Sequence, residues 1–268
     1  MQHLKLIINC GPCERYISQC VDSVRSQTYS EWKAYVTVDA CRDGTYDAAL
    51  RAAGRDRRIH VVSNKRRMYS LCNLIRAIRR SRAAPDDVIV ILDGDDWFAH
   101  RGALRIIADT YAEHNCWMTY GSWISNWVEK SGERTGMWPA YPDGTTNFRH
   151  VRWLGTAVRT WKKWLWDRVD DRDLRDATVG YYRVSEDQAT MLPLLEMSTT
   201  RKARHIPEAL MIYNQTNPWN SGLHMTAEMD RNALHLDKQK PYLPLLPRAE
   251  AARASACEMT RSRDHSTV

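Results

Sequence analysis

The chain has 268 residues, of which 43% are hydrophobic and 26% are charged, with a formal net charge of +7. This composition is that of a globular protein, and the length allows one large domain or two small ones. No run approaches the ~20 apolar residues of a membrane-spanning helix, so the sequence excludes a transmembrane segment.

Short apolar runs alternate with amphipathic segments through the first half of the chain. The patterns predict strands at 4–8, 32–38, 59–62 and 88–92, and helices at 14–27, 45–53, 69–80 and 104–111. The run 88–92 is apolar throughout, which is typical of a central parallel strand buried on both faces. The alternation predicts an α/β fold with a Rossmann-like, doubly wound, mostly parallel sheet that binds ligands beyond the carboxyl ends of its strands.

The second half of the chain is less regular. Residues 116–166 are rich in Trp and broken by Gly and Pro, so we expect a hairpin and long loops there. Trp161 and Trp164 lie one helical turn apart, which fits either an acceptor-side surface or packing. A helix is predicted at 185–197, with Ser185 as its N-cap, and a short strand at 209–213. Residues 241–268, where prolines lead into a polar run, are expected to form a flexible tail.

Three acids follow the most apolar strand directly, in the segment 92–97, Leu-Asp-Gly-Asp-Asp-Trp. Carboxylates this close repel one another unless a cation or hydrogen-bond donors stabilise them. Oxygen ligands suit Mg²⁺ or Mn²⁺, and such an ion can bridge to phosphate oxygens. A plain turn of Asp and Gly explains the same residues without a ligand, and a nucleotidyltransferase or a phosphatase could use the same acids.

Two further acids follow the predicted strand 32–38. Asp39 ends the strand, and Asp43 lies in the tight turn before the next helix. An Asp at a strand end can accept hydrogen bonds from a base or a ribose. In isolation, a capping Asp and a turn Asp explain these positions equally well.

The order of these segments resembles the amino-terminal half of family-2 glycosyltransferases. Residues 16–29, Tyr-Ile-Ser-Gln-Cys-Val-Asp-Ser-Val-Arg-Ser-Gln-Thr-Tyr, are similar to the first helix of that family. The resemblance continues in 185–197, Ser-Glu-Asp-Gln-Ala-Thr-Met-Leu-Pro-Leu-Leu-Glu-Met, and in 213–218, Tyr-Asn-Gln-Thr-Asn-Pro. Several separated motifs therefore agree over roughly residues 4–222.

The resemblance implies a GT-A fold in a single glycosyltransferase domain over residues 1–240. Residues 1–115 would form the nucleotide-sugar-binding half, and residues 116–240 an irregular, Trp-rich half for the acceptor and catalysis. By the same resemblance Asp39 contacts the nucleoside, Asp93 lies near the ribose and diphosphate, and Asp95 holds the metal.

Less specific positions complete the expected donor and metal sites. We expect Asp43 and Arg66 to contribute to donor binding and His224 to be a third metal ligand, because some relatives carry a His in that region. A lone His is more often a surface residue, and the basic run 65–67 can face solvent instead of phosphates. The expected metal is Mn²⁺ or Mg²⁺, and the expected donor is a nucleotide-sugar, first of all a UDP-sugar.

The acid pair Glu186–Asp187 looks like the family's site for the catalytic base. An inverting transfer needs a carboxylate that takes the proton of the acceptor hydroxyl while the anomeric carbon is attacked from the face opposite the leaving diphosphate. We favour Asp187 as this base over Glu186. The alternative is that the pair only stabilises the start of a helix, where the helix dipole favours negative charge.

Two rival functions remain open from the sequence. Cys10-Gly-Pro-Cys13 spells the redox motif of thioredoxins and lies between a predicted strand and helix, although no Trp precedes the first Cys. That reading leaves the acids at 93–96 and the helix at 185–197 unexplained. The basic charge and the eleven Trp also fit a nucleic-acid-binding protein, in which acids at strand ends would repel phosphate unless a metal were bound.

The acceptor and the location follow from weaker signals. A glycan, a lipid-linked, a protein or a nucleic-acid acceptor all fit the sequence, and it does not fix the oligomeric state. The seven Cys and the absence of a secretory pattern before the first predicted strand lead us to expect reduced thiols and a cytoplasmic protein.

Overall fold

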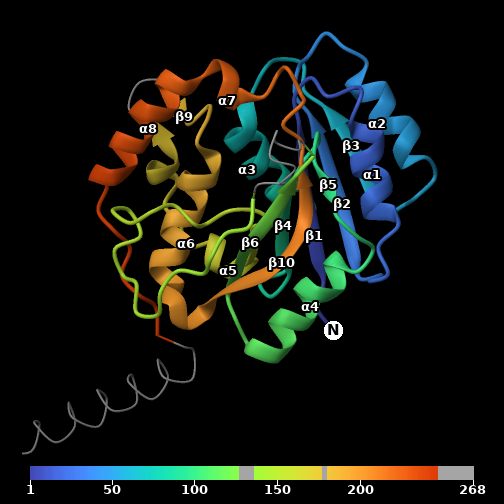
Figure 1. Ribbon diagram of the computed structural model, residues 1–268. Coiled ribbons are helices and arrows are strands. Elements are labelled where there is room, and N and C mark those ends of the chain that lie inside the picture. Colours follow the sequence, from blue (N-terminus) through green and yellow to red (C-terminus); the bar gives the residue numbers. More distant parts are fainter. Residues whose placement is uncertain (127–135, 177–179, 247–268) are drawn as a thin grey trace, which may run out of the picture.

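An eight-stranded sheet runs through the computed structural model, in the order β3-β2-β1-β4-β7-β6-β10-β5 (Figure 1). The structure describes residues 1–126, 136–176 and 180–246. The strands of this sheet are β1 (Leu4–Cys10), β2 (Trp32–Val38), β3 (Ile59–Ser63), β4 (Val88–Asp93), β5 (Trp97–Phe98), β6 (Met118–Ser125), β7 (Thr160–Lys162) and β10 (Ala203–Tyr213). A separate two-stranded sheet pairs β8 (Arg175–Asp176) with β9 (Gly180–Tyr181).

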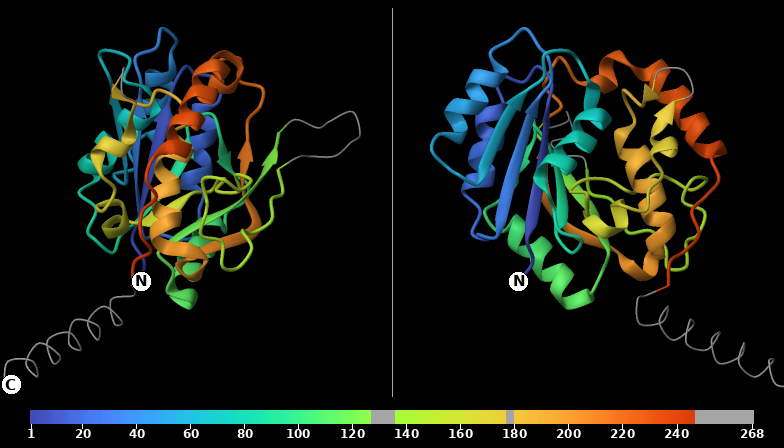
Figure 2. Two further views of the ribbon diagram at one scale, coloured as in Figure 1. Left: turned by 90° about the vertical axis from the view of Figure 1, so that its left-hand side faces the viewer. Right: turned by 180° about the vertical axis from the view of Figure 1, so that it is seen from behind.

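Helices cover both faces of the large sheet (Figures 1 and 2). They are α1 (Ile17–Arg25), α2 (Thr45–Ala53), α3 (Tyr69–Ser81), α4 (Ala103–His114), α5 (Lys163–Trp166), α6 (Glu186–Lys202), α7 (Ser221–His224), α8 (Thr226–Lys238) and the 3₁₀ turn η1 (Asp171–Leu174). One hydrophobic cluster contains Leu6 and Ile8 of β1 with side chains of α1, α2 and α4. The other contains Ile7 with side chains of α3 and α6, because successive strand residues point to opposite faces.

The sheet is mostly parallel, as the alternation of strands and helices predicts. Strands β1 to β4 are mutually parallel, and β6 is parallel to β10. The exceptions are β7, which lies antiparallel between β4 and β6, and β5, which is antiparallel to β10. The carboxyl ends of β1, β2 and β4 therefore meet at one edge of the sheet, where the predicted acids lie.

The structure differs from the sequence-based expectations chiefly after residue 115. In the region expected to hold a hairpin and long loops, β6 and β7 do form an antiparallel pair, but a long connection separates them and β6 is a regular strand in the middle of the sheet. The strand expected at 209–213 is the end of the much longer β10, which contains irregular pairing with β6. These strands are determined by pairing with strands that are distant in the sequence, and such pairing leaves no local hydrophobic period.

The carboxyl-terminal segment of the described chain packs against α6. Leu245 N donates to Met197 O at 2.9 Å, and Tyr242 N donates to Glu196 Oε2 at 3.0 Å. The first residues of the expected flexible tail, 241–246, are thus attached to the domain. Residues 247–268 lie outside the described residues.

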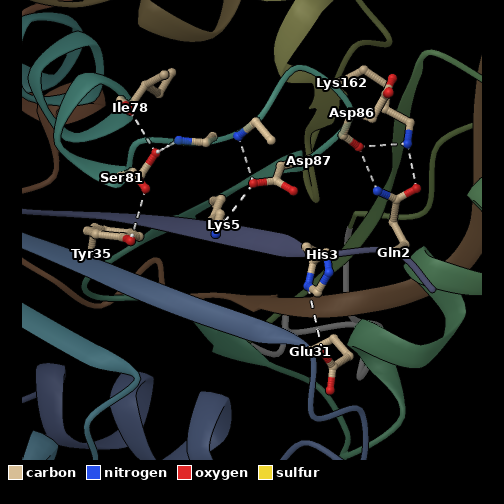
Figure 3. Close-up of polar contacts among 12 residues, drawn as sticks. Gln2, His3, Lys5, Glu31, Tyr35, Ile78, Ser81, Asp86, Asp87 and Lys162 are labelled. Atoms are coloured by element: carbon tan, nitrogen blue, oxygen red, sulfur yellow. Dashed lines mark hydrogen bonds and ion pairs between the residues drawn. The ribbon is translucent and has the colours of Figure 1, made fainter.

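Polar contacts join several chain segments at the amino-terminal edge of the sheet (Figure 3). Gln2 Nε2 and Lys162 Nζ donate to the carbonyl of Asp86 at 2.7 and 2.9 Å, and Lys162 also contacts Gln2. Lys5 forms an ion pair of 3.4 Å with Asp87. These contacts tie β1 and β7 to the loop before β4, at the edge opposite to the acids.

A buried ion pair anchors α6 within the second half of the chain. Arg149 contacts both carboxylate oxygens of Glu196, at 2.6 and 2.9 Å, with side chains that are only 1% and 2% exposed. Arg149 also donates to the carbonyl of Leu236 at the end of α8. The pair therefore connects the long loop before β7 with α6 and α8.

We expect Arg149→Met to lower the free energy of unfolding by about 3–5 kcal/mol, because Glu196 would keep a buried charge without its partner. Urea denaturation monitored by circular dichroism measures this change. Arg105→Met is the matched control, since it breaks an exposed ion pair with Asp109 and should cost no more than about 1 kcal/mol. Equal losses in the two variants would contradict the assignment.

Candidate active site

A cavity of about 510 Å³ opens at the carboxyl ends of β1, β2 and β4. This volume lies within the range of pockets that hold small-molecule ligands. The charged side chains that line it are Asp39, Arg67, Asp93, Asp95, Asp96, Arg159, Arg183, Glu186 and Asp187. The structure thus brings five of the predicted site residues to one cavity. They are Asp39 after β2, Asp93 and Asp95 at the end of β4, and Glu186 and Asp187 of α6.

The close approach of β1 to the turn after β4 fixes the positions of Asp93 and Asp95. Gly94 N donates to the carbonyl of Asn9 at 2.8 Å, and a Cβ at Gly94 would lie 2.4 Å from Cys10 Sγ. Only glycine fits there, because any side chain would displace the turn. The two acids therefore flank a residue that is held against the end of β1.

Burial and mutual repulsion make these carboxyls hard to ionise. Burial raises the pKa of Asp93 to about 7, with Arg159 lowering it and neighbouring acids raising it. Burial also raises the pKa of Asp95, whose Oδ2 accepts a hydrogen bond of 2.8 Å from Asn217. Asp96 is 1% exposed and accepts from Asn214 N at 2.8 Å, so it ties the turn to the end of β10.

The chemistry of Asp93 and Asp95 fits a hard divalent cation, although the protein alone does not form a complete cage. Two carboxylates whose charged forms are disfavoured by burial gain stability from a cation, and oxygen ligands suit Mn²⁺ or Mg²⁺. Within the described ranges, no three His, Cys, Asp or Glu side chains are grouped to hold a metal. His224 is exposed on α7, shares a hydrogen bond of 2.7 Å with the carbonyl of Pro218, and does not line the cavity.

Asp39 organises the loop that leads into α3. Its carboxylate accepts hydrogen bonds from Met68 N at 2.8 and 3.1 Å, from Tyr69 N at 2.8 Å and from Asn64 Nδ2 at 3.1 Å. Tyr69, with φ of 62°, adopts the left-handed conformation that costs about 1–3 kcal/mol in a residue other than glycine. Asp39 therefore holds in place a strained turn on the wall of the cavity.

Asp43 and Arg66 lie outside the cavity lining. Asp43 accepts from Thr45 Oγ1 at 2.8 Å and from Glu14 N at 3.2 Å, at the start of α2. Burial alone would raise the pKa of Asp43, but hydrogen bonds from Cys41, Thr45 and Glu14 together lower it. Arg66 is exposed, and its neighbour Arg67 lines the cavity instead, with its guanidinium 4.7 Å from the ring centre of Tyr69.

The acid pair lies in the first turn of α6, but the predicted cap is absent. Ser185 adopts the left-handed conformation with φ of 62°, and its side chain makes no capping hydrogen bond. Glu186 instead pairs with Arg159, whose Nη1 lies 3.2 Å from Glu186 Oε1. Asp187 lines the cavity, and the described parts of the chain offer its carboxylate no hydrogen bond or ion pair.

Arg159 lines the cavity, and the sequence analysis assigned it no role. It is 6% exposed and directly precedes β7, and its carbonyl accepts from Ile91 N of β4 at 3.0 Å. The three-residue β7 has no recognisable period, so no local pattern could place this arginine beside Glu186. Asn217 was missed for the same reason, because its partner Asp95 is distant in sequence. In the basic run 65–67, the sequence analysis favoured Arg66, whereas Arg67 lines the cavity.

Aromatic side chains supply a further part of the wall. Trp123, Trp153, Tyr213 and Trp219 all line the cavity, and Trp219 is 65% exposed. Trp161 and Trp164, by contrast, pack internally: Trp161 stacks on Trp166 at 5.8 Å and Trp164 meets Trp117 edge-on at 5.0 Å. Of the two readings that the sequence left open for this pair, the structure supports packing.

The two cysteines of the thioredoxin-like motif form part of the cavity wall. Cys10 and Cys13 are 2% and 3% exposed, and Cys13 N donates to Thr45 Oγ1 at 2.9 Å. The hydrogen bond with Cys13 and burial raise the pKa of the Cys10 thiol well above its usual range. A redox-active pair needs an accessible thiolate of lowered pKa, and Cys10 has the opposite environment.

The sequence matches glycosyl transferase family 2 over residues 6–175, which is more than half of the chain. The protein belongs to this family, as the order of motifs indicated. The putative glycosyltransferase EpsE of Bacillus subtilis is 31% identical over 94 residues, which make up 35% of this chain and 33% of that protein.

Solved structures of other glycosyltransferases share the fold. Staphylococcus aureus TarS, residues 1–349, aligns with a TM-score of 0.58 at 16% identity, over 80% of this chain and 60% of that chain. Glucosyl-3-phosphoglycerate synthase from Mycobacterium tuberculosis aligns with a TM-score of 0.59 at 11% identity, over 89% of this chain and 80% of that chain. These similarities confirm the predicted GT-A fold. The chain spans one third of EpsE and three fifths of the TarS fragment.

No helix among the described residues is long and apolar enough to cross a bilayer.

We expect Cys10→Ser/Cys13→Ser to retain most of the glycosyl transfer activity, because both side chains are buried in the wall of the cavity and neither presents an accessible thiol. The wild-type protein should not accelerate the reduction of insulin disulfides by dithiothreitol, with thioredoxin as the positive control. Rapid insulin reduction that the double variant loses would restore the redox hypothesis.

Proposed function

We propose that this protein transfers a sugar from a nucleotide-sugar to an acceptor hydroxyl with inversion at the anomeric carbon. Among nucleotide-sugars, the proposed donor is a UDP-sugar. The observation that carries the proposal is the meeting of the acids after β4 with the acid pair of α6 in one cavity. Structures of TarS with UDP-GlcNAc and of glucosyl-3-phosphoglycerate synthase with Mn²⁺ and UDP support this kind of donor.

In this proposal Asp93 and Asp95 hold Mn²⁺ or Mg²⁺, and Asp39 and Asp93 lie on the side of the nucleoside and ribose. When bound, the cation stabilises the negative charge of the leaving diphosphate. Three further residues remain predictions: Asp43 and Arg66 for the donor site, and His224 for the metal site. All three lie outside the cavity lining, so their positions do not support these roles. Arg67 is the basic side chain of that loop which faces the cavity.

The transfer itself is a single displacement. The acceptor oxygen forms a bond to the anomeric carbon, the bond from that carbon to the diphosphate oxygen breaks, and its electron pair stays on the diphosphate. The proton of the acceptor hydroxyl passes to the carboxylate of Asp187, which lines the cavity and has no partner among the described residues. Glu186, paired with Arg159, is the less suited of the two acids.

The acceptor is the least defined part of the proposal. Glycan, lipid-linked, protein and nucleic-acid acceptors all present hydroxyls, and no described residue selects among them. Trp153 and Trp219 offer apolar faces to whichever acceptor enters the cavity.

A nucleotide diphosphate should raise the melting temperature only when Mn²⁺ or Mg²⁺ is present. Ligand at a hundredfold excess over Kd stabilises the folded state by about 2.7 kcal/mol. Asp95→Asn should abolish the metal-dependent shift in a thermal-shift assay of UDP, GDP, CDP and TDP. Asp109→Asn, which changes an exposed acid on α4, is the control and should keep the shift. A shift of equal size without metal would contradict the donor site.

Asp187→Asn should leave donor and metal affinity nearly intact while lowering turnover by about 10² to 10⁴, the usual range for loss of a general base. Steady-state kinetics with isothermal titration of the donor separates these two effects. Glu186→Gln should reduce turnover less. NMR of the product should show the opposite anomeric configuration to the donor. Retained configuration, or normal turnover of Asp187→Asn, would remove Asp187 from this role.

A further inference from the structure

The two acids at the start of α6 have different surroundings although they are neighbours in sequence. Arg159 Nη1 and Glu186 Oε1 are 3.2 Å apart, and both side chains are only 8% exposed. Ser70 Oγ approaches Glu186 Oε2 at 3.4 Å. Asp187 shares the cavity with Arg159 but pairs with no described residue. Of these two acids, the guanidinium thus makes its direct ion pair with Glu186.

The charge of Arg159 acts on three carboxylates at once. Burial alone would lower the pKa of this guanidinium, but Glu186, Asp187 and Asp93 together raise it above its usual range. In return, Arg159 opposes the rise in pKa that burial causes for Glu186 and Asp93. One buried cation therefore compensates for the acids of both α6 and β4.

We propose that Arg159 is a positioning residue for glycosyl transfer, which acts through Glu186 and so determines that Asp187 is the base. This inference rests on the proposed function. Because the Ser185 side chain makes no capping bond, the ion pair to Arg159 is the contact that holds the first turn of α6 against the start of β7. With Glu186 held in this way, the carboxylate of Asp187 stays directed to the acceptor.

The ion pair predicts which kinetic parameter depends on Arg159. Without it, the first turn of α6 loses its contact with the start of β7, and the carboxylate of Asp187 is no longer held towards the acceptor. A misplaced base slows the transfer step, so kcat falls. The donor is proposed to lie against the acids after β4, so the donor KM should change little.

The experiment compares kcat and the donor KM at saturating acceptor and Mn²⁺. For Arg159→Met we expect kcat to fall about 10²-fold, the cost of a small misplacement of a reacting group, with the donor KM nearly unchanged. Arg159→Lys, which keeps the charge, should recover part of kcat. Glu186→Gln should lower kcat less, and Arg159→Met/Glu186→Gln should be no slower than Arg159→Met alone, because both changes remove one ion pair.

Arg149→Met is the matched control, because it also breaks a buried Arg–Glu pair on α6. Its pair with Glu196 lies outside the cavity lining, so the folded variant should lose stability and keep its kcat. A fall of kcat in Arg149→Met as large as that in Arg159→Met would overturn the inference, since disturbance of α6 alone would then explain it.

An unchanged kcat in Arg159→Met, with a raised KM for the donor, would also overturn the inference and make Arg159 a donor-binding residue. Should Arg159→Met fail to fold, Glu186→Gln decides, and an unchanged kcat in that variant overturns the proposal. Failure of the proposed function is recognised separately. It would appear as normal turnover in Asp187→Asn or as metal-independent donor binding, whatever the Arg159 variants do.

Discussion

The gathering of carboxylates at one edge of the sheet is the constraint on which the rest of the structure depends. Asp93 and Asp95 from β4 and its turn share one cavity with Glu186 and Asp187 from α6, and burial disfavours the charged forms of Asp93, Asp95 and Glu186. Arg159 is a buried cation that opposes this effect at Asp93 and Glu186. A metal ion and the diphosphate of a donor would bring the remaining charges of the proposed reaction.

Two buried ion pairs hold the helix that carries the proposed base. Arg159 pairs with Glu186 in the first turn of α6, and Arg149 pairs with Glu196 further along the same helix. Burying an ion pair costs desolvation, so its net contribution to stability is small, whereas losing one partner is strongly destabilising. We therefore interpret the two pairs as fixing where α6 lies, which sets the position of Asp187 relative to the end of β4.

The sequence by itself determined the class of fold and indicated the acids that line the cavity. Strand and helix periods are local, so most elements up to residue 115 could be located from residues close in the chain, with the two-residue β5 as the exception. An acid at the end of a predicted parallel strand is also a local feature, and it indicated Asp39, Asp93 and Asp95. The motif order added Glu186 and Asp187, and the family match over residues 6–175 confirmed the family.

Only the tertiary structure decided which side chains meet. Strand β7 lies antiparallel between β4 and β6, and this placement brings Arg159 to Glu186. A three-residue strand is too short to be predicted from a local sequence pattern. The path of the loop before α3 turns Arg67 rather than Arg66 into the cavity, and α7 keeps His224 outside its lining. Such contacts depend on strand order and loop path, which are set by packing between residues far apart in the chain, whereas sequence patterns report on neighbours.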